Sequence, residues 1–188
     1  ENYMAHYGRQ PLSVEYALLG LLGDSPAHPY EVHQRLIKAS PLSHVWRIKR
    51  GHTYALLGRL EEEGLVTSWL EPQDAKPPRK MLALTREGRE TFTRWMYEPV
   101  RKPREMRLTF LAKLYFATRK GTASELVAAQ YNECRRWLSD LESVHSGVDT
   151  YEQMVLEFRR QQVRSIMAWL STCRKMINRK EGGDVLSA

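Results

Sequence analysis

Apolar residues recur with helical spacing through the first third of the chain. After Ser13 they fall at i, i+3, i+4, i+7 and i+8, the period of an amphipathic helix: Val14, Ala17, Leu18, Leu21 and Leu22. Ser13 is a suitable N-cap, and residues 23–26, with a glycine and a proline, end the helix. Pro29 fits the first turn of a second helix, which Pro41 closes. A third helix is predicted over residues 49–63, followed by a glycine stop.

The pattern then changes from a helical to an extended one. Residues 65–70 are β-branched and aromatic enough for a strand, residues 71–78 are rich in turn formers, and residues 80–85 predict a returning strand. A fourth helix is predicted from Thr85, which gives a partial cap signal, to about Tyr97. Three helices followed by strand, loop and strand are the order of a winged helix-turn-helix.

The remainder of the chain predicts a helical domain after a linker. Pro99 and Pro103 mark the linker, and helices are predicted at 105–118, 122–145 and 150–179, the last two forming an antiparallel hairpin around a turn at 146–149. Such a hairpin exposes an apolar stripe, which a two-fold copy of the chain would cover most simply. The predicted dimer contacts are Leu126, Trp137, Leu141, Phe158, Trp169 and Met176.

These elements define a mainly α-helical fold with a small β-hairpin wing. The predicted domains are a flexible arm over residues 1–12, a winged helix-turn-helix DNA-binding domain over 13–98, a linker over 99–104, a helical dimerisation domain over 105–180 and a flexible tail over 181–188. Because residue 1 is Glu, we expect the natural start to differ, with Met4 as one candidate initiator.

Composition excludes several classes of protein. The chain has 188 residues, 42% of them apolar, and its longest apolar run is too short to cross a bilayer. Two cysteines make no disulfide framework, and the six histidines lack zinc-site spacing, so neither a secreted disulfide scaffold nor a metal site is expected. No nucleophile, phosphate-loop or dinucleotide fingerprint occurs, so neither an enzyme nor a cofactor is predicted. The expected compartment is the cytoplasm.

The charge of the chain is positive and unevenly distributed. The net charge is +7, and residues 32–60 contain no acidic side chain. On the third helix, Gly51, Ala55 and Gly58 fall opposite the apolar side, which would let a duplex approach the backbone closely. The predicted DNA contacts there are Lys49, Arg50, His52, Tyr54, Ala55 and Arg59. The alternative is that Gly51 only marks the helix start, that Gly58 is tolerated and that His52 is an ordinary surface side chain.

The turn-rich loop adds a second group of candidate DNA contacts. Lys76, Arg79 and Lys80 surround a stiff Pro77-Pro78 pair and are predicted to meet phosphates or the minor groove. A solvated basic turn is the alternative. Three tryptophans, Trp95, Trp137 and Trp169, are candidates for a pocket that takes a small planar aromatic effector, although such residues also serve as core or dimer contacts.

The chain resembles the PadR family of bacterial transcriptional regulators. Residues 51–66 look like that family's recognition helix and the start of its wing, residues 79–88 like its second wing strand and fourth helix, and residues 18–22 and 28–31 like its first two helices. Residues 111–117 and the hairpin beyond resemble the larger C-terminal domain of the virulence-activator-like subgroup. The resemblance implies a homodimer in which Tyr54 contacts DNA, and some relatives respond to phenolic acids or planar drugs. Ala55 and Gly58 depart from the family, which often has Pro and a basic residue there.

The predicted function is that of a homodimeric, sequence-specific transcriptional regulator. Its partner would be double-stranded DNA with a pseudo-palindromic operator, and its action repression, with relief by a planar aromatic effector as an open extension. Two alternatives stay open. One is a winged-helix adaptor that binds protein, and the other is an aromatic-ligand-binding protein with weak DNA binding.

Overall fold

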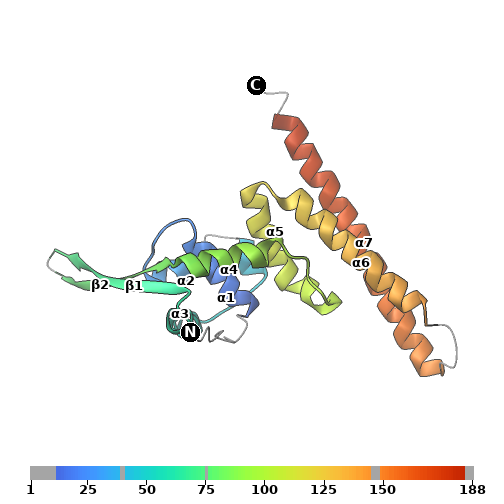
Figure 1. Cartoon of the computed structure of the whole chain (residues 1–188), viewed down its shortest axis with the longest axis horizontal. Helices are drawn as coiled ribbons and strands as arrows, with labels where there is room; N and C mark the ends of the chain where they lie inside the picture. The colour runs from blue at the N-terminus through green and yellow to red at the C-terminus, as the bar shows by residue number, and fades with distance from the viewer. Residues whose placement is uncertain (1–11, 39–40, 75, 145–148, 185–188) are drawn as a thin grey trace, which may run out of the picture. The chain divides into compact units, whose positions relative to one another are not determined.

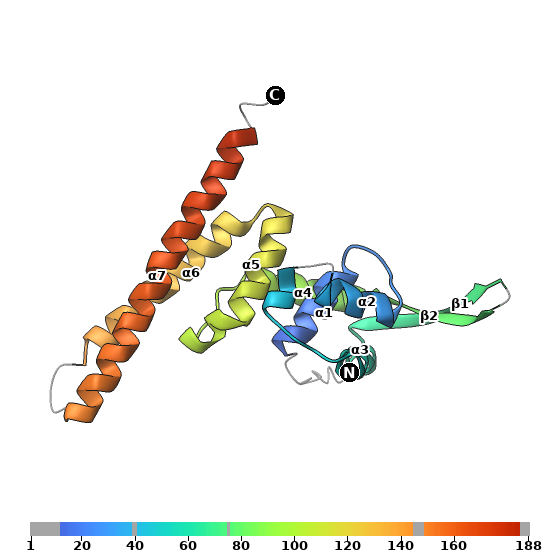
Figure 2. The same ribbon diagram turned by 180° about the vertical axis from the view of Figure 1, so that it is seen from behind.

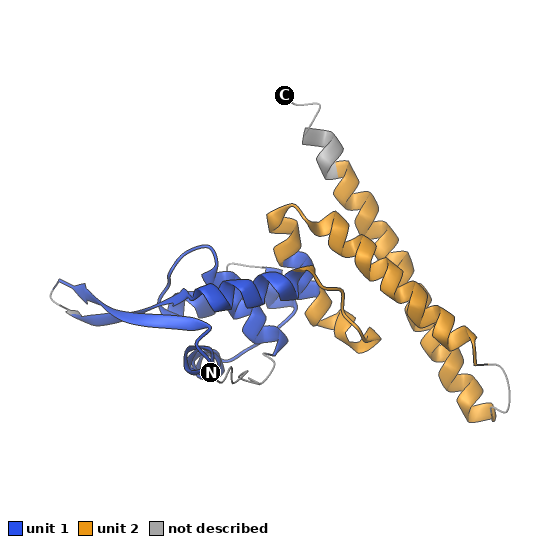
Figure 3. Ribbon diagram, viewed as in Figure 1, with its two compact units in different colours: residues 1–96, 111–115 blue, residues 97–110, 116–188 orange. Residues whose placement is uncertain are grey.

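A computed structural model describes residues 12–38, 41–74, 76–144 and 149–184. The chain forms two compact units: unit 1 comprises residues 1–96 and 111–115, and unit 2 comprises residues 97–110 and 116–188 (Figure 3). The predicted arm falls almost entirely outside the described residues, as do most of the predicted turn at 146–149 and the last four residues of the predicted tail. Among the described residues, no helix has both the length and the hydropathy to cross a bilayer.

Unit 1 begins with three helices and a short 3-10 turn. These are α1 (Ser13–Leu22), α2 (Pro29–Ile37), the turn η1 (Pro41–His44) and α3 (Arg50–Glu62). Pro29 opens α2, as predicted. Ser13 is not the N-cap of α1, as the sequence predicted, but its first helical residue, because Leu12 precedes it in an extended conformation. The carboxylate of Glu15 accepts the Leu12 N–H at 2.6 Å and so caps the helix instead.

A two-stranded antiparallel sheet follows, which we call the wing. It consists of β1 (Val66–Gln73) and β2 (Lys76–Leu84) and extends beyond the helices of unit 1 (Figure 1). The strands are longer than predicted and take in most of residues 71–78, which the sequence indicated as loop. Pro77 and Pro78 are compatible with β2 because the register shifts between Glu71 and Gln73 on the facing strand, which leaves both prolines outside the paired positions.

The base of the wing is joined tightly to α4 (Arg86–Tyr97). The Thr85 hydroxyl donates to the Gly64 carbonyl at 2.8 Å and accepts the Gly88 N–H at 3.0 Å. Gly88 lies so close to β1 that an added Cβ would stand 2.0 Å from the Leu65 carbonyl oxygen. A glycine is therefore required where α4 starts. The core beneath is aliphatic and includes Leu18, Leu19, Leu36, Leu56, Leu60 and Leu82.

Unit 2 is dominated by two long helices that run side by side (Figure 2). It contains the turn η2 (Pro103–Arg107), part of α5 (Thr109–Lys120), α6 (Ala123–Glu142) and α7 (Thr150–Asp184). The guanidinium of Arg160 on α7 donates to the Leu141 carbonyl at 2.8 and 3.2 Å, and that of Arg164 reaches Glu142 at 3.1 Å. These contacts join the C-terminal end of α6 to the first half of α7.

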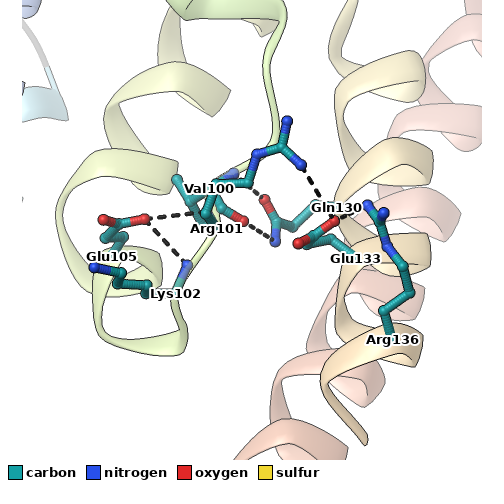
Figure 4. A network of polar contacts seen from close by, with 7 residues as sticks. All are labelled: Val100, Arg101, Lys102, Glu105, Gln130, Glu133 and Arg136. Atoms are coloured by element: carbon teal, nitrogen blue, oxygen red, sulfur yellow. Dashed lines mark hydrogen bonds and ion pairs between the residues drawn. The ribbon is translucent and has the colours of Figure 1, made fainter. Parts of the chain in front are cut away.

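The segment predicted as a linker is packed against α6 (Figure 4). Val100 is buried, and its backbone N–H and carbonyl both bond the side-chain amide of Gln130, at 2.7 and 3.2 Å. The Glu105 carboxylate accepts the N–H groups of Arg101 and Lys102, both at 3.1 Å. Because a side chain satisfies the polar groups of Val100, the backbone can be buried there without a strand or helix.

Candidate nucleic-acid interface

The outward face of α3 is open and carries small side chains. Thr53, Leu56, Leu57 and Leu60 are buried, as the helical pattern predicted, and Ala55 on the opposite side is exposed. A Cβ added at Gly51 or at Gly58 would meet no atom within 4 Å. Tyr54 is 40% exposed beside this stripe. Neither glycine is required by packing, so the fold leaves room along α3 for a surface from outside the chain.

The first turn of α3 concentrates positive charge. Lys49 precedes the helix, Arg50 is its first residue, and His52 follows, all three of them exposed. Within the described part of the chain, no carboxylate lies at ion-pair distance from Lys49 or Arg50. The helix dipole adds positive potential at the same end. This end of α3 is suited to an anion such as a phosphate.

Arg59 differs from those cations because a buried carboxylate holds it. Its Nη2 lies 3.2 Å from Oε1 of Glu15, whose side chain is fully buried on α1. In the structure Arg59 ties α3 to α1, and its predicted DNA contact stays a prediction. The sequence does not reveal this role of Glu15, because an acidic residue in the first turn of a helix ordinarily indicates capping alone.

A hydrogen bond between α2 and α3 fixes the back of the interface. Nδ1 of the buried His33 lies 2.9 Å from Oγ1 of Thr53. Burial lowers the pKa of His33 because it disfavours the imidazolium, and the positive charge of Arg50 lowers this pKa further. His33 is therefore neutral at physiological pH.

The lowered pKa of His33 predicts a loss of stability in mild acid. Below about pH 6.5 the unfolded chain binds a proton that the folded chain resists, so the free energy of unfolding falls until the pH passes the folded pKa. Chemical denaturation at a series of pH values measures the free energy of unfolding. In a His33→Gln variant, the part of its pH dependence that comes from His33 should be absent. NMR titration should also show the pKa of His33 rising in Arg50→Ala; an unchanged pKa would contradict the assigned contribution of Arg50.

The wing cations are paired with carboxylates of the helices. Arg79 bonds Glu31 on α2, and Lys80 lies 2.7 Å from Oε2 of Glu61 on α3. The hydroxyl of Ser68 on β1 donates to Oε1 of the same Glu61 at 2.5 Å. These bonds hold the pKa of Glu31 and of Glu61 below the usual range. The side chain of Lys76 lies outside the described residues, so its predicted DNA contact stays a prediction.

The three candidate tryptophans have different surroundings. Trp95 is buried in unit 1, where its ring stacks on Tyr16 at a centroid distance of 4.8 Å. The Lys113 ammonium lies 4.9 Å from the Trp95 ring centroid and donates to the Trp95 carbonyl at 2.5 Å. With its ring in these contacts, Trp95 is part of the core of unit 1 and does not line an effector pocket there.

In unit 2, Trp137 lines a pocket between α6 and α7. Pro103, Asp140, Leu141, Arg159, Gln162 and Val163 complete the lining. Trp169 is not among these residues; its ring contacts Phe110 edge-on at a centroid distance of 5.9 Å. Of the candidate tryptophans, Trp137 lines this pocket.

The predicted dimer contacts divide into buried and exposed residues. Leu126 is only 2% exposed within the single chain, so it has no surface left for a partner. Trp137 and Leu141 are half-buried, and Trp169 is 38% exposed. Phe158 and Met176 on α7 are 68% and 65% exposed. Two large side chains that the prediction omitted are also exposed: Met154 one turn and Tyr151 two turns before Phe158.

Comparison with known proteins identifies relatives along most of the chain. Residues 18–94 match the model of the "Transcriptional regulator PadR-like family". The negative transcriptional regulator PadR of Bacillus subtilis (strain 168) is 25% identical over 180 residues, which cover 88% of this chain and 98% of the relative. The crystal structure of Bacillus subtilis PadR in complex with operator DNA matches with 25% identity and a TM-score of 0.46, over 88% of this chain and 99% of that one. The complex with p-coumaric acid matches with 23% identity and a TM-score of 0.40, over 88% and 96% of the two chains.

Proposed function

Residues 18–94 belong to the PadR-like family of transcriptional regulators, and from this premise we propose that the chain represses transcription by binding a pseudo-palindromic operator as a homodimer. The family consists of regulators and not of enzymes. The observation that carries the proposal is the open face of α3, where two glycines without packing neighbours lie beside Tyr54 and the cations Lys49 and Arg50, which form no ion pair with another described residue.

This face suits the major groove of DNA. The groove is about 12 Å wide and admits one α-helix, and small outward residues let the helix backbone approach the base edges. Ala55 would make apolar contact with a thymine methyl group, and Tyr54 would donate a hydrogen bond from its hydroxyl. Lys49, Arg50 and His52 would hold phosphates at the N-terminal end of the helix. Arg59 contributes through its bond to Glu15, which fixes α3 against α1.

A homodimer would present α3 twice. Two-fold symmetric regulators read half-sites about 34 Å apart, one turn of the duplex, which gives the operator its palindromy. We assign the dimer contact to the exposed apolar residues of α7, with Phe158 in the stripe that Tyr151 and Met154 begin, and with Trp169 and Met176 further along. An exposed apolar stripe of this kind indicates a surface that a partner covers.

The Trp137 pocket is our candidate for an effector site. Its indole ring, the apolar side chains of Leu141 and Val163, and the cation of Arg159 suit a small planar aromatic anion. The Bacillus subtilis relative has been crystallised with p-coumaric acid, which has this chemistry. An effector would relieve repression only if it bound the DNA-free arrangement more tightly than the DNA-bound one.

Selection of bound sequences from a random duplex pool tests the function directly. The proposal expects an enriched palindromic sequence. The logarithm of the association constant for that sequence should fall linearly with the logarithm of salt concentration. A protein-binding adaptor would enrich nothing and show no salt-dependent duplex affinity. A ligand-binding protein with weak DNA binding would enrich nothing, yet planar aromatic anions would quench its tryptophan fluorescence. Either result would contradict the proposal.

Replacing Phe158 by Ser should weaken the dimer. The side chain is 68% exposed in the single chain, so the substitution removes little of the internal core but a large apolar contact with a partner. Sedimentation velocity should show the wild type as a dimer and Phe158→Ser shifted toward monomer. Glu157→Gln, next to it on α7 and also exposed, is the matched control and should remain dimeric. An unaltered dimer in Phe158→Ser would place the interface elsewhere.

A further inference from the structure

The two neighbouring cations of β2 are each held by a different helix. Successive residues of a strand point to opposite faces of a sheet, so Arg79 and Lys80 leave the wing on opposite sides. Arg79 meets the carboxylate of Glu31 on α2, and Lys80 meets that of Glu61 on α3 at 2.7 Å. The wing is thus fastened by an ion pair on each face.

Both carboxylates have a second contact that keeps them in place. Glu31 also accepts the backbone N–H of His28 at 3.2 Å, at the start of α2. Glu61 also accepts the hydroxyl of Ser68 at 2.5 Å. These second contacts hold each carboxylate in position to accept its cation. A DNA phosphate, which offers the same kind of acceptor oxygens, must compete with an acceptor already in position.

We propose that Glu31 and Glu61 hold the wing cations Arg79 and Lys80 away from phosphates and so restrain binding to duplexes of any sequence. This inference rests on the proposed DNA-binding function. A cation paired with its own protein neutralises no phosphate and releases no counterion, so it adds nothing to sequence-independent affinity. The cations of the first turn of α3 have no such restraint among the described residues.

The pairing of the wing cations with carboxylates affects how tightly the protein would bind DNA. Phosphate contacts carry no sequence information, so each cation kept from the backbone of DNA lowers the affinity for random duplex and for an operator by similar factors. The pairs also fix the direction of the wing relative to α2 and α3. Arg79 and Lys80 are accordingly positioning residues, held by acids that lower the sequence-independent part of the affinity for DNA.

A double-mutant cycle in the full chain tests the proposal. Glu61→Gln removes the charge but keeps an acceptor for Ser68, and Lys80→Met removes the cation but keeps its apolar stem. With Lys80 present, Glu61→Gln should tighten binding to a random-sequence duplex about fivefold near 0.1 M salt. The salt slope, which is the slope of the logarithm of the association constant against the logarithm of salt concentration, should become steeper by about 0.9. With Met at position 80, Glu61→Gln should change neither quantity. Glu62→Gln, an exposed acid on the same helix, controls for loss of negative charge alone.

The outcomes separate this inference from the proposed function. Equal effects of Glu61→Gln with Lys or Met at position 80, equal effects of Glu62→Gln, or no effect at all would overturn the inference. Circular dichroism checks the fold, and if a Glu61 variant fails to fold, Glu31→Gln with Arg79→Met forms an independent cycle on the other face. If the wild type binds duplex and the cycles show no coupling, only this inference fails. A wild type without any salt-dependent duplex affinity overturns the proposed function as well.

Discussion

Replacing Arg50 and Tyr54 together by alanine should weaken operator binding by about 2 kcal/mol, roughly thirtyfold, while the chain stays folded. Both side chains are exposed on α3, so their removal leaves no cavity in the core. Loss of the Arg50 phosphate contact should also flatten the salt slope by about 0.9. Fluorescence anisotropy of a labelled operator, titrated at several salt concentrations, measures both quantities. Unchanged affinity and slope would contradict the assignment of α3 as the recognition helix.

The variant Gly58→Ala separates contact with DNA from stability of the fold. Its new methyl group meets nothing within 4 Å in the free protein, and alanine favours a helix over glycine by about 0.8–1.0 kcal/mol. We therefore expect a more stable protein that binds its operator less tightly, because the methyl group stands between the helix and the bases. A stabilised variant with wild-type operator affinity would show that DNA does not approach this face.

The largest effect on stability is expected from Gly88→Ala. The added Cβ would lie 2.0 Å from the Leu65 carbonyl oxygen and 2.9 Å from its carbonyl carbon. Both atoms are backbone, so α4 and the base of the wing would have to separate. Overpacking typically costs about 1–3 kcal/mol, and rigid neighbours place this substitution at or above the upper end. Urea denaturation followed by circular dichroism gives the free energy of unfolding.

Gly51→Ala is the matched control for that loss. Its Cβ would meet nothing within 4 Å, so the same chemical change should leave the free energy of unfolding equal or higher. Similar unfolding midpoints for the two variants would mean that α4 does not pack against Leu65 as closely as the structure has it.

Local periodicity was sufficient to predict most of the fold. The recurrence of Leu18, Leu21 and Leu22 predicts α1, Pro29 predicts the start of α2, and the apolar side of α3 is buried as expected. These features depend on residues within one or two turns of each other, which a sequence displays directly. The length of β1 and β2 was underestimated because Pro77 and Pro78 indicate a loop unless the strand is known to be an edge.

The partners of the charged residues could not be predicted in the same way. Glu31 and Arg79 are 48 residues apart in the chain, and Glu61 and Lys80 are 19 apart. A sequence shows that such cations exist but not which carboxylate the fold brings beside each one. The same holds for Gln130, which bonds Val100 across 30 residues and converts an expected linker into packed chain. Exposed small residues, in contrast, need no partner, and the face of α3 was predictable for that reason.

The unequal lengths of α6 and α7 bear on hydrogen–deuterium exchange. At 1.5 Å per residue, the 35 residues of α7 extend about 52 Å, whereas the 20 residues of α6 extend only about 30 Å. At least two fifths of α7 therefore has no stretch of α6 beside it, and isolated helices are only marginally stable in water. The amides of that part should exchange quickly in dilute protein and slowly in concentrated protein, because only a second copy of the chain would then cover them.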